Sequence, residues 1–140
     1  MGTTRVVAVE NILSSSAKHF VVVVDDDAKM RESLESLLQS AEFSVAVFAS
    51  AEDTLQSLIL AEANCLVTDI RMPGMHGLEL QRRVKHDFPR LPVILITGNY
   101  DEQVESRALA DGAVGLLYKP FDPSDLVSRI RLAIAKSSEE

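Results

Sequence analysis

The sequence has only one cysteine, fewer basic than acidic residues and no long apolar run. Cys65 cannot form an internal disulfide, and its neighbours Leu66 and Val67 favour a small buried core residue over a reactive thiol. The 14 basic and 21 acidic residues give a formal net charge of -7. This charge repels a phosphate backbone, so we expect no direct binding of nucleic acid by this segment.

No apolar stretch approaches the length needed to span a membrane. The run from Val6 to Val9 follows Arg5, but Glu10 interrupts it well short of the core of a signal peptide. We therefore expect a cytoplasmic protein in a reducing setting, without membrane contact.

A chain of 140 residues with 46% hydrophobic content fits one globular domain with a real core. Residues 1–19 contain the polar cluster Ser14 to Ser16 and lack a sustained periodicity of apolar residues, so we expect a flexible extension. A short strand from Arg5 to Val9 is the alternative there. We expect the domain over residues 20–137 and a tail over residues 138–140.

Five short apolar runs predict strands, and a segment of helical period follows each run. The strands are expected at residues 20–24, 44–48, 65–68, 93–97 and 114–118. The apolar helix faces are Met30, Leu34, Leu37 and Leu38; Leu55, Leu58 and Ile59; Leu80 and Val84; Val104 and Ala108; and Leu126, Ile130 and Ile134. Because parallel crossovers need helix-length connections, this alternation predicts an α/β fold with a parallel sheet and helices on both faces.

Polar residues stand at the ends of four of the five predicted strands. In parallel sheets, ligands bind beyond the carboxyl ends of the strands, where the strand order reverses. With the order 2-1-3-4-5, the first and third strands are neighbours, so Asp25, Asp26 and Asp69 would share one crevice. Three close carboxylates repel unless a cation lies among them, and their oxygen atoms suit Mg²⁺. The sequence therefore predicts a magnesium site.

Asp69 stands alone at the end of the central strand, and a carboxylate can act as the nucleophile that forms an aspartyl phosphate. Phosphoryl transfer also calls for groups that neutralise charge on the phosphoryl oxygens. Mg²⁺, the ammonium group of Lys119 and the hydroxyl of Thr97 would supply them. Each residue alone could be an ordinary turn, cap or loop residue, but the functional hypothesis explains all of them together.

Four motifs occur in a specific order: VDDD at 24–27, TDIRMPGMHG at 68–77, ITG at 96–98 and YKPF at 118–121. Over roughly residues 20–136 the chain resembles the receiver domain of bacterial two-component response regulators. The segment from Thr97 to Ala113 is similar to receivers of nitrogen-fixation regulators. The resemblance implies a flavodoxin-like fold of five parallel strands in the order 2-1-3-4-5.

The resemblance also implies that Asp69 accepts a phosphoryl group from a histidine kinase or a phosphotransfer protein. Asp26 would ligate Mg²⁺ directly, Asp25 through water, and the backbone carbonyl of Arg71 would complete the protein ligands together with Asp69. Such a chain is a signalling domain that assists its own phosphorylation and dephosphorylation, not a turnover enzyme.

Further roles implied by the resemblance fall on Thr97, which would contact the phosphoryl oxygens, and on Lys119, which would pair with the acceptor and precede a cis peptide bond. The sequence departs from the family pattern at Leu116, where an aromatic residue is usual. Tyr118 shares a strand face with Leu116 and is the alternative switch residue. His76 replaces a common acid, and we expect no role for it in transfer.

Two enzyme classes fit the sequence less well than a receiver domain does. A phosphohydrolase of the haloacid-dehalogenase type needs a second Asp two residues after its nucleophile, where this chain has Arg71. A P-loop enzyme needs a Gly-rich loop that ends in Lys-Ser or Lys-Thr, which the sequence lacks. A third alternative, a module that binds partners without phosphorylation, is disfavoured because every acceptor residue is present.

The chain ends soon after the fifth predicted helix, without a recognisable helix-turn-helix. It is either a stand-alone receiver or the N-terminal part of a transcription regulator. We expect an output domain or protein to bind the face formed by the fourth helix, the fifth strand and the fifth helix. A phosphorylation-dependent homodimer is a further alternative.

Overall fold

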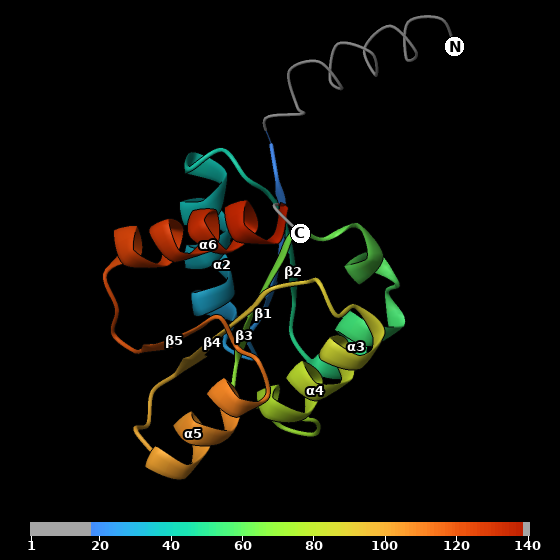
Figure 1. Cartoon of the computed structure of the whole chain (residues 1–140). Helices are drawn as coiled ribbons and strands as arrows, with labels where there is room; N and C mark the ends of the chain where they lie inside the picture. Colours follow the sequence, from blue (N-terminus) through green and yellow to red (C-terminus); the bar gives the residue numbers. More distant parts are fainter. Residues whose placement is uncertain (1–17, 139–140) are drawn as a thin grey trace, which may run out of the picture.

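The computed structural model describes residues 18–138. Their five strands form one parallel sheet in the order β2-β1-β3-β4-β5 (Figure 1). The predicted fold class and strand order are confirmed. The strands are β1 (Phe20–Val24), β2 (Ser44–Phe48), β3 (Cys65–Asp69), β4 (Val93–Thr97) and β5 (Gly115–Tyr118).

Helices cover both faces of the sheet (Figure 1). They are α2 (Ala28–Ser40), α3 (Ala51–Gln56), the 3-10 helix η1 (Ile59–Glu62), α4 (Gly77–Asp87), α5 (Glu102–Ala110) and α6 (Pro123–Ser138). One core cluster joins α2 and α6 to the sheet, and a second joins α3, α4 and α5 to the opposite face. Within the described part of the chain, no helix is both long enough and apolar enough to cross a membrane.

The central strands are the most deeply buried part of the molecule. Every residue of β3 and β4 is buried, as are Val21 to Val24 of β1. Burying a valine or leucine side chain contributes about 1.5–3 kcal/mol relative to exposing it. Three of the four polar motifs therefore lie at the ends of the most buried strands, β1, β3 and β4, and the fourth follows β5.

Polar caps fix where helices begin and end. The Asp27 carboxylate accepts hydrogen bonds from the backbone N–H groups of Lys29 and Met30 and caps α2. Ser50 caps α3 in the same way through the N–H of Asp53. Gly112, at φ +98°, follows α5 in a left-handed conformation that glycine adopts without strain. These caps hold the loops that lead into and out of the sheet.

The predicted second helix is wrong beyond residue 56. Leu58 takes a left-handed backbone conformation (φ 62°) and is 80% exposed, so it is not on an apolar helix face. Ile59 begins the 3-10 helix, which turns Leu60 into the core instead. At the end of α3 the Ser57 hydroxyl donates to the carbonyl of Thr54, and the left-handed turn at Leu58 follows. Apolar spacing alone does not predict where such a turn interrupts the helix.

Other differences are small. The third strand includes Asp69, and the fifth begins at Gly115, one residue later than predicted; Val114 before it is exposed. Cys65 is fully buried, as predicted. The predicted extension over residues 1–19, with its alternative strand, lies outside the described residues except for Lys18 and His19, and the predicted tail does so except for Ser138.

Candidate functional site

Three carboxylates from two strands meet at the carboxyl edge of the sheet. β1 and β3 pair in parallel with Val24 opposite Thr68, so the residues that follow these positions emerge side by side. One oxygen each of Asp25, Asp26 and Asp69 lies within 4.8 Å of the others. Asp25 and Asp69 are buried, whereas Asp26 is exposed. The structure thus brings the three predicted acids together.

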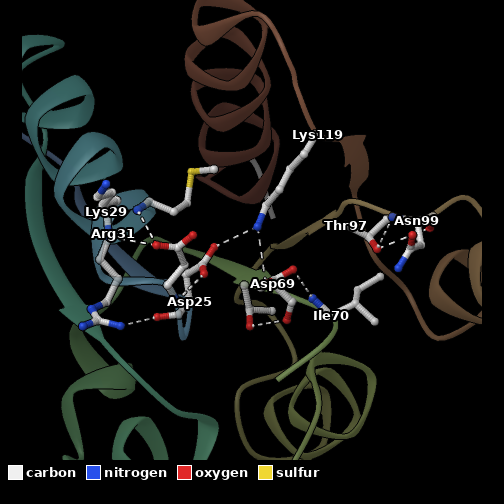
Figure 2. A network of polar contacts seen from close by, with 11 residues as sticks. Asp25, Lys29, Arg31, Asp69, Ile70, Thr97, Asn99 and Lys119 are labelled. Carbon is white, nitrogen blue, oxygen red and sulfur yellow. Dashed lines mark hydrogen bonds and ion pairs between the residues drawn. The ribbon is translucent and has the colours of Figure 1, made fainter. Parts of the chain in front are cut away.

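Lys119 reaches into this acidic cluster from the end of β5 (Figure 2). Its Nζ lies 3.2 Å from Oδ2 of Asp25 and 3.4 Å from Oδ2 of Asp69. The backbone N–H of Lys119 donates to the carbonyl of Thr97, which fixes the strand end that carries the side chain. The Lys119–Pro120 peptide bond is cis, as the resemblance implies.

The electrostatics of the cluster follow from burial and charge. Burial raises the pKa of the Asp69 carboxyl, the negative charge of Asp25 raises it further, and Lys119 offsets only part of this effect. Burial opposes the charge on Lys119, but Asp25 and Asp69 together outweigh it and raise the pKa of Lys119. The site therefore holds three acids against one ammonium group, with a surplus of negative charge.

This donor set fits a hard divalent cation. Mg²⁺ takes oxygen ligands and is commonly held by one or two carboxylates, with water and phosphate in its other positions. The acidic cluster offers only carboxylate oxygens, and exposed Asp26 leaves one side open to solvent. The residues present thus fit Mg²⁺, and Lys119 does not neutralise them fully.

The Asp69 side chain is held at both carboxylate oxygens. The backbone N–H of Ile70 donates to Oδ1 of Asp69 at 2.9 Å, while Lys119 approaches Oδ2 (Figure 2). Below it, Gly77 begins α4 directly against the backbone carbonyl of Asp69, so that a Cβ atom at Gly77 would collide with that oxygen. Sequence reasoning did not single out Gly77, because only the fold brings it to this carbonyl.

Thr97 is buried beside the site, and its hydroxyl exchanges hydrogen bonds with the backbone of Asn99 (Figure 2). A cavity of about 570 Å³ opens next to it, lined by residues that include Ile70, Arg71 and Val104. Thr97 thus has neighbouring space on the side of α5. Arg71 is exposed, and its side chain borders this cavity.

The two predicted switch positions on β5 differ in their surroundings. Leu116 packs against the core cluster under α3, α4 and α5. The ring of Tyr118 lies 5.6 Å from that of Tyr100, with 50° between the ring planes. Burial, followed by the charge of nearby Glu105, raises the pKa of the Tyr118 hydroxyl. Sequence reasoning missed Tyr100, because it lies in a loop outside every motif.

His76 lies near the site, and its side chain caps the N-terminus of α4. Its Nδ1 accepts the N–H of Glu79 at 3.4 Å and caps the helix. The side chain is exposed.

The comparisons with known proteins agree with this geometry. Residues 21–131 match the family model of the response regulator receiver domain. The chain therefore belongs to the receiver domain family of two-component response regulators. Receiver domains of this family bind Mg²⁺ at an acidic cluster of the kind formed by Asp25, Asp26 and Asp69.

Individual relatives support the resemblance to nitrogen-fixation regulators. The chain is 39% identical to the transcriptional regulatory protein FixJ of Bradyrhizobium diazoefficiens over 122 residues, which cover 87% of this chain and 60% of FixJ. A solved structure of the response regulator StyR is 38% identical, with a TM-score of 0.80, and the match covers 87% of this chain and 62% of StyR.

A receiver domain from Clostridium thermocellum has a TM-score of 0.82 at 26% identity. That match covers 86% of this chain and 97% of the other. The chain spans about half to 60% of the length of several of the curated relatives it matches.

Proposed function

We propose that this chain accepts a phosphoryl group on Asp69 from the phosphohistidine of a histidine kinase or phosphotransfer protein, and that this step changes its binding to a partner. The observation that carries the proposal is the position of Lys119 Nζ, within 3.4 Å of both Asp25 and Asp69 in a cluster of three acids. An ammonium group there can balance the negative charge that a phosphoryl group adds.

The chemistry is a displacement at phosphorus. A carboxylate oxygen of Asp69 attacks and forms an O–P bond, the P–N bond to the donor histidine breaks, and the leaving imidazole takes up a proton. The bonds from Ile70 N–H and Lys119 hold the carboxylate in one orientation before the donor arrives. Such positioning together with charge neutralisation is the main contribution of a protein to phosphoryl transfer.

Asp26, Asp69 and the backbone carbonyl of Arg71 would hold Mg²⁺ directly, and Asp25 would hold it through water. When bound, the ion supplies positive charge to the phosphoryl oxygens. Attack of water on the phosphorus of the aspartyl phosphate breaks the O–P bond to Asp69, releases inorganic phosphate and returns the free carboxylate. The chain then acts as a reversible signalling domain rather than as a turnover enzyme.

The switch that we propose begins at Thr97. Its hydroxyl would leave Asn99 for a phosphoryl oxygen and draw the loop after β4 with it. Leu116 has no aromatic ring to follow this movement. Tyr118 would respond instead through Tyr100, which belongs to the same loop as Asn99 and contacts the Tyr118 ring. Phosphorylation would then shift the population of two existing states of this loop.

The output surface that we propose is the face formed by α5, β5 and α6. Five large apolar side chains are exposed within residues 18–138. Three of them lie on this face: Leu109 in α5, Val114 directly before β5, and Leu132 in α6. This face would bind an output domain or a second phosphorylated copy. The proposed setting is cytoplasmic, and the chain is either a stand-alone receiver or the N-terminal part of a transcription regulator such as FixJ.

The test uses a phosphorylated histidine kinase or phosphoramidate as donor, with Mg²⁺. We expect acid-labile label on the wild-type chain and none on Asp69→Asn. Full labelling of the variant would identify another acceptor. Equal partner affinity with and without phosphorylation would favour the alternative of a module that binds without phosphorylation.

A further inference from the structure

The loop between β3 and α4 is tied to a distant part of the chain by one carboxylate. Oε2 of Glu52, in the first turn of α3, accepts the backbone N–H of Met75 at 2.9 Å. Gly74 is in a left-handed conformation (φ +73°), and a Cβ atom there would lie only 2.5 Å from the same Oε2. The loop therefore passes directly against the Glu52 carboxylate.

The first turn of α3, which carries the Glu52 anchor of the loop, is well fixed. Ala51 and Thr54, on either side of Glu52, are buried, and Ser50 caps the turn by accepting the N–H of Asp53. The hydrogen bond from Met75 lowers the pKa of the Glu52 carboxyl, so the charged acceptor is the favoured form at neutral pH. A hydrogen bond to a charged group contributes more than one between neutral groups.

The loop that Glu52 holds borders the acceptor at both of its ends. It begins directly after Asp69 and Ile70 and includes Arg71. It ends at Gly77, whose N–H donates to the carbonyl of Ile70 at 2.8 Å. Within residues 18–138, the bond that the Glu52 carboxylate accepts is the one side-chain hydrogen bond between residues 71–75 and another element.

We infer that Glu52 is a positioning residue for phosphoryl transfer: it holds the loop after β3 so that Arg71 presents its backbone carbonyl to the metal beside Asp69. The inference rests on the proposed function. Glu52 acts through the loop and contacts no reacting group. Its loss should weaken Mg²⁺ binding more than it slows transfer once Mg²⁺ is saturating.

The experiment compares Glu52→Ala and Glu52→Gln with the wild type in the full chain, using acetyl phosphate as donor over a range of Mg²⁺ concentrations. Groups that orient metal ligands typically change metal affinity by 10–100-fold. We expect Glu52→Ala to raise the Mg²⁺ concentration for half-maximal phosphorylation about tenfold, with a much smaller change in the rate at saturating Mg²⁺. Glu52→Gln keeps a carbonyl oxygen that can accept the Met75 N–H, so it should restore most of the affinity.

Asp53→Ala is the matched control, because it removes a carboxylate from the same helical turn and the Asp53 side chain holds no part of the loop. We expect wild-type Mg²⁺ dependence for it. Amide exchange of Met75 is the second readout, and it applies even if Glu52→Ala does not fold. Slow exchange in the wild type supports the anchor, whereas exchange at the rate of a free loop overturns it.

The outcomes separate the two proposals. No phosphorylation of the wild type at any Mg²⁺ concentration would overturn the proposed function, and the inference with it. Phosphorylation of the wild type together with an unchanged Mg²⁺ dependence in Glu52→Ala would overturn the inference alone. An equal shift in Asp53→Ala would also overturn it, because the effect would then follow from charge on α3 and not from the loop contact.

Discussion

Asp69→Asn removes one charge from the acidic cluster while keeping the shape of the side chain, and we expect it to stabilise the Mg²⁺-free protein. Burial and the neighbouring charge of Asp25 raise the pKa of Asp69, so the ionised form is disfavoured in the folded state. Where Asp69 is ionised, the folded wild type carries this electrostatic penalty. A neutral amide avoids that penalty.

The magnitude follows from three opposing contributions. Carboxylate oxygens of Asp25 and Asp69 lie within 4.8 Å of each other, so their repulsion amounts to at least about 3 kcal/mol at an effective dielectric constant of about 20. Attraction to Lys119 at 3.4 Å amounts to about 5 kcal/mol on the same scale. Desolvation of the buried carboxylate costs several kcal/mol. With about 3–4 kcal/mol for desolvation, repulsion and desolvation together exceed the attraction to Lys119 by about 1–2 kcal/mol, which is the expected net gain for Asp69→Asn and corresponds to an increase of roughly 3–7 °C in Tm.

The assay is thermal and urea unfolding in EDTA across a range of pH. Because the folded pKa of Asp69 is raised, the folded state binds its proton more readily than the unfolded chain does. The wild type therefore loses stability as pH rises from about 4 through the folded pKa, and Asp69→Asn lacks this contribution. The gap between the two proteins should close toward acidic pH. A variant that is no more stable than wild type at neutral pH in EDTA would refute the reasoning.

Three further predictions rest on separate contacts. Gly77→Ala should destabilise the fold by about 1–3 kcal/mol in urea unfolding, because its Cβ atom would collide with the carbonyl of Asp69; an unchanged midpoint would show that α4 can shift freely. Burial raises the pKa of the Cys65 thiol to about 12, so a thiol reagent should label it only after unfolding, and rapid labelling of the native protein would contradict its buried position. Tyr100 and Tyr118 are the only tyrosines, and the chain has no tryptophan; phosphorylation should therefore change tyrosine fluorescence, whereas an identical spectrum would count against their proposed coupling.

Much of the fold could be predicted from the sequence because its strands are short, apolar and separated by helical periods. The runs at 20–24, 44–48 and 93–97 became strands with the predicted bounds. Burial of both faces of a parallel sheet produces such continuous apolar runs. Because parallel strands end at the same edge of the sheet, the polar residues that follow the apolar runs were expected to meet there. The structure brings Asp25, Asp26, Asp69 and Lys119 together at this edge.

What the sequence could not reveal depends on contacts between distant segments. The 3.6-residue spacing favoured Leu58 on a helix face, but a left-handed turn exposes it and buries Leu60. Glu52 reads as an ordinary helix residue until the fold places Met75 against it. Tyr100 likewise gains meaning only from its contact with Tyr118. Local pattern predicts elements and their faces, but not which loop a given side chain will hold.

Mass spectrometry of the chain after incubation with acetyl phosphate and Mg²⁺ tests phosphoryl acceptance at Asp69 most directly. We predict one added phosphoryl group, located on the peptide that contains Asp69, lost on treatment with hydroxylamine and missing when EDTA replaces Mg²⁺. A phosphoryl group on a different residue, or labelling that is the same in EDTA, would contradict the proposal.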